Sequence, residues 1–424
     1  MMGFFSEIIF SLLTLLAFGL FVQKISRIRS SILLGKATFL NDAPLQRWKN
    51  VFLLALGQKK MFRNPIVALL HLIVYIGFII INIELIEIIL DGLLGTHRIL
   101  AQPLGNYYKQ FINCFEILAF LVIIACIIFL VRRNILKIKR FISKDLNGWP
   151  SSDANYILIA EIILMSLFLL MNATDTSYQF TISSKISPWL LYTEPTLYLI
   201  EKSAWWLHII GIYAFMNYLP YSKHLHIILA FPNAYYAPLI PKGIMHNMPA
   251  IQNEVLYAMQ PELAPTDALA PESFGAKEAT ELSWKNLMDA YSCSECGRCS
   301  TACPATSTGK LLSPRKIMMA TRDRIESISK NIQQNKQFIP DGKTLLHDYI
   351  SVEELRACTT CNACVEECPI SISPLDIIME LRRSLVMEQS NAPQEWNGMF
   401  SNIENNFAPW KFAPDDRDAW TKQV

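Results

Sequence analysis

Eight of the ten cysteines form two groups with identical spacing late in the chain. The groups are Cys293-x2-Cys296-x2-Cys299-x3-Cys303-Pro304 and Cys358-x2-Cys361-x2-Cys364-x3-Cys368-Pro369. Three thiolates at this spacing wrap three corners of an iron–sulfur cube, and the fourth, just before a proline, reaches the other cube in two-cluster proteins. We therefore expect two [4Fe-4S] clusters. The first expected ligand set is Cys293, Cys296, Cys299 and Cys368, and the second is Cys358, Cys361, Cys364 and Cys303.

Two simpler uses of paired cysteines fit this pattern less well. A structural zinc site takes four ligands as C-x2-C pairs, without the third and fourth cysteines of each group. A disulfide framework belongs to an oxidising compartment, whereas the charge pattern described below predicts that this half of the chain is cytoplasmic. The doubled motif is therefore the most specific chemical signal in the sequence.

The elements that must position these cysteines include a strongly apolar N-terminal half. Hydrophobic residues make up 52% of the chain and charged residues 17%, against about 25% charged in a typical soluble domain. Five apolar stretches are long enough, or nearly so, to cross roughly 30 Å of hydrocarbon as helices. They cover residues 4–22, 65–90, 111–131, 154–172 and 204–231. This composition excludes a disordered chain, a coiled coil and a typical cytosolic enzyme.

Loop charges predict the orientation of these spans. The segments after the first and third spans hold fifteen basic residues, and those after the second and fourth hold four. By the positive-inside rule the N-terminus is outside and the C-terminal half is cytoplasmic, which predicts a multi-pass protein of the inner membrane. The first stretch carries Glu7 and lacks a basic start, so we expect a retained span rather than a signal peptide. Residues 45–61 are expected to lie as an amphipathic segment on the inner surface.

Histidines at matched depths in these spans suggest a haem. Two imidazoles facing each other between packed helices can clamp one haem iron. His71, early in the second span, should lie at the depth of His226, at the end of the fifth, and this pair is our first choice; His224 is the alternative. His208 lies 18 residues before His226, five turns of one helix, so both should project from the same side about 27 Å apart.

A second haem has weaker support. His208 would need a partner near the outer face, which His97 could supply if the turn after the second span folds back. Otherwise these histidines simply form hydrogen bonds between helices. Arg63 and Lys223 lie at the inner edge and could pair with haem propionates, or only extend to the surface. Four carboxylates within or at the ends of spans are candidates for proton handling, or else form interhelical hydrogen bonds: Glu84, Glu87, Glu116 and Glu161.

The polar half divides into three parts. Residues 241–284 contain the Pro- and Ala-rich run PELAPTDALAPESFG and are expected to be a linker. Residues 285–390 should form a helical two-cluster domain, with helices starting at Ser313-Pro314 and Ser373-Pro374. Residues 391–424 are expected to be a tail for partner docking. The predicted fold is thus all-α: a five-helix transmembrane bundle followed by a cytoplasmic α-helical ferredoxin domain.

With these motifs in place, the cysteine half resembles the C-subunit of heterodisulfide reductases and the ferredoxin part of anaerobic glycerol-3-phosphate dehydrogenase. The tail NNFAPWKFAPDDRDAW is similar to the segment after the second cluster motif in that family. The resemblance implies a partner with cysteine-rich CCG repeats, which this sequence lacks. The membrane half resembles the cytochrome b of nitrate reductase gamma and heterodisulfide reductase subunits. That family has two ligands on the second span, of which only His71 is matched here.

Two functions are compatible with these residues. The first is an electron-transfer subunit that links a cytoplasmic CCG-containing or other dehydrogenase partner to the quinone pool, through two [4Fe-4S] clusters and one or two b haems. The alternative is a membrane-tethered Fe–S relay or redox sensor without haem. No nucleophile constellation, nucleotide loop or substrate site is visible, so no catalytic residue is predicted. No basic patch interleaved with aromatic residues predicts nucleic-acid binding.

Overall fold

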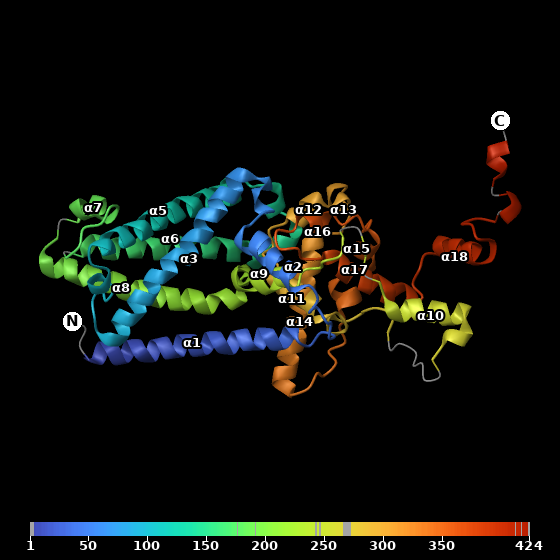
Figure 1. Cartoon of the computed structure of the whole chain (residues 1–424), viewed down its shortest axis with the longest axis horizontal. Helices are drawn as coiled ribbons and strands as arrows, with labels where there is room; N and C mark the ends of the chain where they lie inside the picture. Colours follow the sequence, from blue (N-terminus) through green and yellow to red (C-terminus); the bar gives the residue numbers. More distant parts are fainter. Residues whose placement is uncertain are drawn as a thin grey trace.

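The computed structural model describes residues 4–175, 177–190, 192–241, 244–245, 247–265, 273–411, 413–416 and 418–422. Within these residues the chain is helical, with no β-strand and two isolated β-bridges. Figure 1 shows an elongated molecule in which long helices gather at one end, short helices follow, and the C-terminal segment extends beyond them. The predicted all-α class is confirmed.

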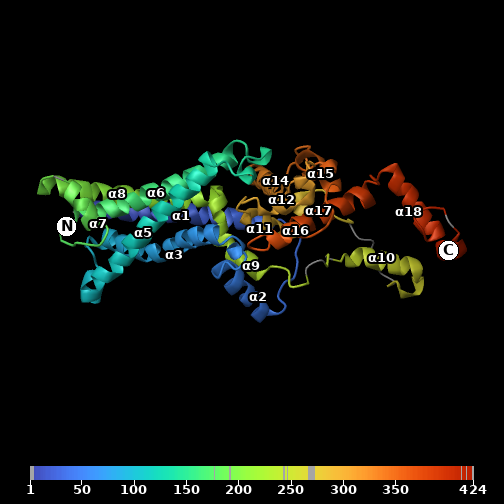
Figure 2. The same ribbon diagram turned by 90° about the horizontal axis from the view of Figure 1, so that it is seen from above.

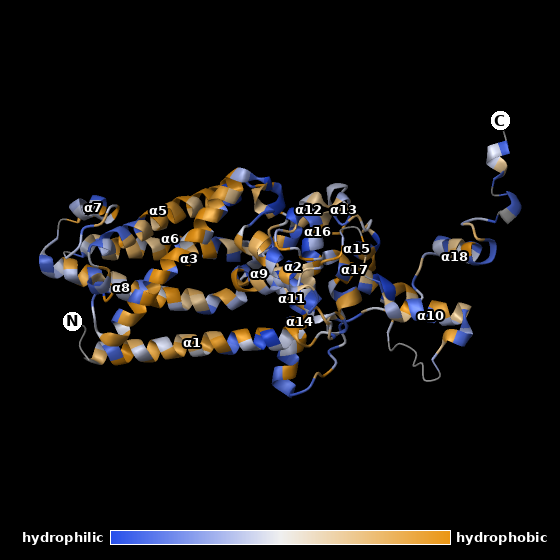
Figure 3. Ribbon diagram, viewed as in Figure 1, coloured by the Kyte–Doolittle hydropathy of each residue, from blue (hydrophilic) through white to orange (hydrophobic). Residues whose placement is uncertain are grey.

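Four long apolar helices form most of the first half. They are α1 (Phe4–Ile32), α3 (Pro65–Leu94), α5 (Tyr108–Leu130) and α6 (Trp149–Thr174). By length and composition each could cross a membrane, and their apolar character is visible along the bundle in Figure 3. Many of their large apolar side chains are exposed on the outside of the bundle, as expected where lipid is the solvent. Four of the five predicted spans are therefore long apolar helices.

The fifth predicted span is broken, so the expectation of one helix over 204–231 is wrong. Helix α8 (Glu194–Tyr218) packs along α6 and contacts α1. It is followed by two 3-10 turns, Leu219–Tyr221 and Lys223–Leu225, and then by α9 (His226–Tyr235). Pro220 cannot continue a helix because it lacks an N–H and its ring clashes with the preceding turn. The hydroxyl of Ser222 then accepts a hydrogen bond from the N–H of His224 at 3.1 Å, which starts the second turn.

This break overturns the expected geometry of two histidines. His208 lies in α8 and His226 begins α9, so they do not project from one side of a continuous helix. Their relative position is set by the turns between the helices. That irregular segment is therefore important for where His226 points.

The segment before α3 contains short helices at the junction between the two halves. These are α2 (Pro44–Asn50), a π-helical turn (Val51–Leu56) and a 3-10 turn (Met61–Arg63). Trp48 and Phe52 are exposed, while the guanidinium of Arg47 is buried against Asp42 and the carbonyl of Tyr235. The predicted segment 45–61 is thus amphipathic, and its place on a membrane surface remains a prediction.

Seven short or medium helices build the cysteine-bearing domain, whose core is formed mainly by leucine, isoleucine and alanine side chains. They are α11 (Trp284–Ser292), α12 (Arg298–Ala302), α13 (Pro304–Ser307), α14 (Pro314–Asn335), α15 (Val352–Arg356), α16 (Ala363–Glu367) and α17 (Pro374–Arg383). The hydroxyls of Ser313 and Ser373 cap α14 and α17, with proline at the first helical position. Both predicted Ser-Pro helix starts are therefore confirmed.

The end of α1 docks directly on this domain. Lys36 donates its N–H to the carbonyl of Leu282 at 2.8 Å and accepts one from Trp284 at 3.0 Å. A side chain at Gly35 would place its Cβ 2.7 Å from the backbone nitrogen of Trp284, so only glycine permits this approach. The hydroxyls of Ser31 and Ser329 add a buried hydrogen bond of 2.8 Å.

A buried arginine makes a second junction. Arg315 in α14 is 1% exposed and contacts the loop between α5 and α6. Its guanidinium pairs with Asp145 at 2.8 Å and 2.9 Å, and it also donates to the carbonyl of Arg140 and to the hydroxyl of Ser143. It reaches the carbonyl of Glu295 at 3.4 Å. Arg315 therefore joins the long-helix half to a cysteine-bearing loop.

The remaining segments contain helix as well. Two short helices, α4 (Ala101–Leu104) and α7 (Ser183–Ile186), lie in the connections around α5 and α8. The expected linker contains α10 (Pro249–Met259), and its residues 266–272 lie outside the described part of the chain. The tail forms α18 (Gln394–Asn406), which Figures 1 and 2 show away from the long helices. Of its residues that resemble the reductase family, Arg417 is outside the described part.

Candidate functional site

The two cysteine groups lie side by side. Helices α12 and α16, which follow the second cysteine of each group, pack against each other. The thiols fall into the two expected sets by their electrostatic neighbours. Cys368 interacts with the first three cysteines of the first group, and Cys303 interacts with Cys358 and Cys364 of the second. The geometry agrees with the predicted ligand sets, and ligation itself remains a prediction.

Both cysteine loops share one backbone shape. Glu295 and Thr360, each two residues after the first cysteine, have φ near +55°. Gly297 and Asn362, each four residues after it, are also left-handed, with φ of 72° and 60°. Left-handed residues curl a short loop tightly, and non-glycine residues adopt that conformation at a cost. The same strained positions in both loops indicate that both are shaped around the same kind of ligand.

The surroundings of the cysteine thiols favour metal binding and do not stabilise free thiolates. Burial raises the pKa of Cys368 to about 11 and that of Cys364 to about 12, so without metal they are protonated at neutral pH. Backbone N–H groups point at two sulfurs, from Ile372 to Cys368 at 3.2 Å and from Thr360 to Cys358 at 3.4 Å. Metal binding must displace the protons, and these donors stabilise the resulting charge.

Each expected ligand set offers four thiols. A four-iron cube takes one thiolate at each iron, so the number and type of donors in each set match one [4Fe-4S] cluster. Within the described residues, no three His, Cys, Asp or Glu side chains form a group that could hold a single metal ion.

A cavity of about 360 Å³ lies between the long helices and the cysteine domain. One part of its wall is formed by all four cysteines of the first expected set. Another part is formed by His71, His224 and His226, so cysteines and histidines line one continuous space. The expectation that His71 and His226 meet at one place is therefore consistent with the structure.

The two preferred histidines are oriented in the same way. The Nδ1 atom of His71 lies 3.0 Å from Oε1 of Gln58, and that of His226 lies 2.8 Å from the carbonyl oxygen of Lys223. Each ring therefore keeps Nε2 for a ligand. Metal-binding histidines are commonly held by such a hydrogen bond on the other nitrogen, which fixes the tautomer and the ring orientation.

His224 also faces the cavity, although it is not the residue we expect to bind iron. Its ring centroid lies 5.6 Å from that of His226, and its buried Nδ1 has no hydrogen-bond partner among the described residues. It lies in the turn before α9, not in the middle of a lipid-facing helix. Its buried, unpartnered nitrogen makes it a polar group available to whatever fills the cavity.

The rest of the wall fits a haem. Apolar side chains such as Val74, Phe78 and Phe231 line the space, and Arg133 and Arg140 contribute buried Nε atoms without hydrogen-bond partners among the described residues. A haem needs axial imidazoles, apolar contacts for its ring and cations for its carboxylates. His71 and His226 would hold the iron, with these two arginines available for the carboxylates.

Two other basic residues, which the sequence suggests as partners of haem carboxylates, bind acidic side chains in this structure. Arg63 forms ion pairs with Glu366 and Glu367 of α16. Lys223 binds Glu295 at 2.7 Å. Both residues join the two halves of the protein through these contacts, and their pairing with propionates remains a prediction. Sequence alone could not show this, because each partner lies far away along the chain.

The second expected histidine pair is not brought together. His208 is buried, with Nδ1 3.0 Å from the carbonyl oxygen of Leu164, and lines a separate cavity of about 70 Å³. His97 is 47% exposed, lies 3.4 Å from Asp175 and does not line that cavity. The proposed pairing of His97 with His208 is therefore wrong in this structure, because the turn after α3 is fixed by polar contacts of its own.

Those contacts also explain two of the four carboxylates. Glu87 accepts hydrogen bonds from the hydroxyl of Tyr108 and the N–H of Leu100. Glu116 accepts from the N–H groups of Ile182 and Ser183, at 2.7 and 3.1 Å. Both are satisfied structural groups, as the simpler interpretation predicts. Their proposed role in proton handling has no geometric support.

The other two carboxylates face cavities. Both oxygens of Glu84 are buried without a hydrogen-bond partner among the described residues, and Arg98 lies 3.8 Å away. Glu161 lines both the large cavity and the small one, where Glu84 and His208 also lie. Proton handling remains a prediction for all four carboxylates, and the surroundings of Glu84 and Glu161 suit it best.

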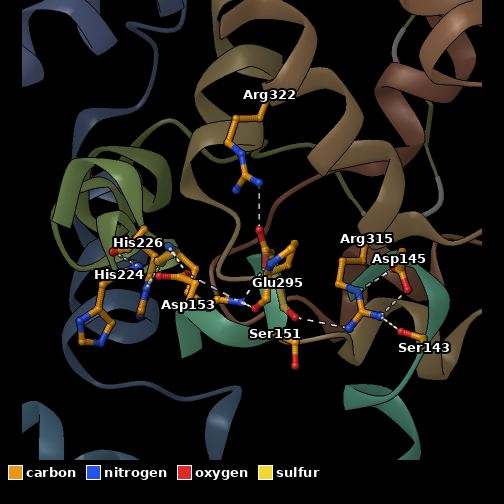
Figure 4. Close-up of polar contacts among 12 residues, drawn as sticks. Ser143, Asp145, Ser151, Asp153, His224, His226, Glu295, Arg315 and Arg322 are labelled. Atoms are coloured by element: carbon orange, nitrogen blue, oxygen red, sulfur yellow. Dashed lines mark hydrogen bonds and ion pairs between the residues drawn. The ribbon is translucent and has the colours of Figure 1, made fainter. Parts of the chain in front are cut away.

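A charged network connects the two sides of the large cavity, and sequence analysis missed it. Figure 4 shows Glu295 with Arg322 on one side and Asp153, His224 and His226 on the other. Glu295 binds Lys223 at 2.7 Å and Arg322 at 2.9 Å. Burial raises the pKa of Glu295, but these two cations outweigh it and hold the pKa below its ordinary value. Only its place inside the first cysteine motif could have drawn attention to this glutamate.

Comparisons with known proteins agree with the cysteine chemistry. Residues 292–372 match a family described as a 4Fe-4S dicluster domain. The chain is 26% identical over 453 residues to the "Probable iron-sulfur-binding oxidoreductase FadF" of Bacillus subtilis, covering 99% of this chain and 61% of the relative. It is 26% identical over 417 residues to the "EtfAB:quinone oxidoreductase" of Syntrophomonas wolfei, covering 90% of this chain and 54% of the relative.

A shorter match supports the resemblance of the cysteine half. One component of the "Ferredoxin/F(420)H(2)-dependent CoB-CoM heterodisulfide reductase" of Methanosarcina acetivorans is 35% identical over 107 residues, 25% of this chain and 53% of the relative. No solved structure matches the chain significantly. The chain spans only about three-fifths or half of its two long relatives. These similarities indicate an iron–sulfur electron-transfer subunit of oxidoreductase type.

Proposed function

We propose that this protein carries electrons between a cytoplasmic redox partner and membrane quinone, with two [4Fe-4S] clusters and one b haem as its resident cofactors. The clusters and the haem supply one-electron chemistry, whereas a quinone takes up two electrons and two protons. The protein supplies the ligands, the spacing and the electrostatic surroundings. The four apolar helices would span the inner membrane with the cysteine domain on the cytoplasmic side, as the loop charges predict.

The observation that carries this proposal is the shared cavity. The thiols of the first cysteine set and the imidazoles of His71 and His226 line one space, so their cofactors would be neighbours. A relay needs its centres close together, and a tether without haem has no need for two oriented imidazoles there. The small cavity around His208 offers no second histidine among the described residues, so we propose one haem rather than two.

The partner is proposed from the relatives. One is named as an oxidoreductase of EtfAB and quinone, and another is a heterodisulfide reductase component. A protein of the EtfAB kind or a CCG-containing subunit is therefore the proposed electron partner. The second cluster is the candidate contact point, because Cys361 is exposed whereas Cys293 is buried.

A simpler function has one observation in its favour. The "Probable membrane-anchored ferredoxin" of Chromohalobacter salexigens is 31% identical over 172 residues, 37% of this chain and 25% of the relative. Under this alternative, the chain would be a tethered Fe–S relay or sensor, and His71 and His226 would have only structural roles.

Cofactor analysis of the detergent-purified full chain separates the two functions. We expect about eight non-haem irons, as two four-iron clusters require, and one b haem in the reduced-minus-oxidised spectrum. His71→Ala and His226→Ala should each abolish the haem signal while iron content is kept. His97→Ala is the matched control, because it removes an exposed imidazole outside both cavities. Eight irons without haem, from haem-supplied cells, would favour the tethered module.

A further inference from the structure

The orientation of His226 depends on a turn that is itself attached to the cysteine domain. The imidazole Nδ1 of His226 is held by the carbonyl of Lys223, three residues earlier in the irregular segment between α8 and α9. The side chain of Lys223 reaches Glu295 at 2.7 Å and the carbonyl of Pro150 at 2.6 Å. Lys223 therefore contacts the imidazole of His226 through its backbone and the first cysteine loop through its side chain.

The partner of Lys223 is fixed on the cysteine side. Glu295 lies between Cys293 and Cys296, has φ of 55° and is 5% exposed. Arg322 in α14 binds its other oxygen at 2.9 Å. A buried carboxylate with two cations is held firmly, and removing one partner leaves it poorly compensated. Glu295 is thus a rigid point to which the turn before α9 is anchored.

The histidine on the opposite side has an analogous arrangement. Gln58 orients His71, and two residues later Lys60 donates to the carbonyl of Cys368 at 3.1 Å. Arg298, in the first cysteine motif, donates to the carbonyl of Lys60 at 3.0 Å. The groups that orient both imidazoles therefore belong to segments held by the first cysteine set.

We propose that Lys223 is a positioning residue of the haem site: its side chain binds the first cysteine loop, and its carbonyl thereby holds the imidazole of His226 in place. Lys60 has the same role for His71, because it anchors the segment that contains Gln58. Contacts with the cysteine domain then orient both axial imidazoles for haem binding, in addition to the role of this domain in holding its own clusters. This inference rests on the proposed haem at His71 and His226. It predicts that the interdomain contacts of Lys223 and Lys60 control haem retention through the histidines that their segments orient.

The test measures haem loss from the purified full chain. Haem transfer to excess apomyoglobin is followed optically for the wild type and for Lys223→Gln. Loss of a residue that orients a metal ligand typically weakens metal binding by about 10–100-fold, so we expect haem loss to be roughly tenfold faster, with iron content kept at the wild-type level.

Arg322→Gln is the matched control, since Arg322 binds the same carboxylate but lies in α14, away from the turn before α9. We expect its haem loss to stay within about twofold of wild type. If Arg322→Gln accelerates haem loss as much as Lys223→Gln does, a general effect of the Glu295 charge explains the result and the proposal fails. Unchanged haem loss in Lys223→Gln also overturns it.

Two further variants keep the proposal testable. If Lys223→Gln loses its iron, Glu295→Gln decides in the same assay together with Arg322→Gln. Faster haem loss in Glu295→Gln but not in Arg322→Gln supports the proposal, and an unchanged rate in Glu295→Gln refutes it. Lys60→Gln tests the second arm, with about tenfold faster loss expected from weaker orientation of His71. A wild-type protein without haem would instead refute the proposed function, which distinguishes the two failures.

Discussion

Replacing Arg315 by methionine should loosen the contact between the two halves of the protein. The Arg315 side chain is 1% exposed and that of Asp145 is 9% exposed, and the two form a close ion pair. Removing one partner of a buried pair costs about 3–5 kcal/mol, because the other charge stays buried. At about 1.4 kcal/mol per tenfold change, this amounts to roughly two to three and a half orders of magnitude in the opening equilibrium.

Hydrogen exchange measured by mass spectrometry reports this opening directly. We expect faster exchange in residues 139–147 and 294–298, the two segments joined by Arg315, with little change at the far end of the long helices. Lys316→Met is the control on the same helix: its side chain is 40% exposed, and its partner Glu354, which is 4% exposed, keeps hydrogen bonds from Ser351. Because water screens the exposed cation and the carboxylate keeps other donors, we expect this change to cost less than the change at Arg315. If Arg315→Met changes exchange by less than tenfold, the clamp is weaker than its geometry indicates.

Three further outcomes are expected. Gly92→Ala should destabilise the packing of α1 on α3 by about 1–3 kcal/mol, since the added Cβ would lie 2.4 Å from the Phe10 ring; a thermal-melting shift near zero would contradict this. Cys361→Ser should remove about four of eight irons, those of one cluster, and leave haem content unchanged, and loss of all iron would show that the two sites are not independent. Burial raises the pKa of Asp145, but Arg315 outweighs it and holds the pKa below its ordinary value. The contact should therefore be fully stable above the unfolded value of about 3.9 and weaken as pH falls below it, and exchange in residues 139–147 at pH 3.5 and pH 6 tests this.

Local sequence signals predicted the elements well. The cysteine spacing, the two Ser-Pro helix starts and four of five apolar helices depend on residues close together in the chain. The fifth span is the exception, because hydropathy continues through 204–231 although Pro220 cannot continue a helix. Pro220 is therefore the local sequence signal for the break.

The site was predictable only in part. Residue type and depth predicted that His71 and His226 lie close together, and both line one cavity. The pairing of His97 with His208 depended on a turn that Asp91 and Asp175 hold elsewhere. The roles of Lys223 and Glu295 were not predictable, because their 72-residue separation carries no periodic signal. Contacts between distant segments are set by tertiary packing, which a single sequence does not encode in any local pattern.

The wall of the large cavity is contributed by segments from Leu54 to Pro374. The sequence suggests a modular protein, in which a linker joins a membrane anchor to a cofactor domain. Proteins of this kind are natural candidates for truncation and domain exchange. Here neither half alone could reproduce the space in which His71 faces the first cysteine set. A chimaera that joins this cysteine domain to another membrane anchor would also need Lys60 and Lys223. The two halves must therefore be kept together in engineered variants, and we expect them to evolve together.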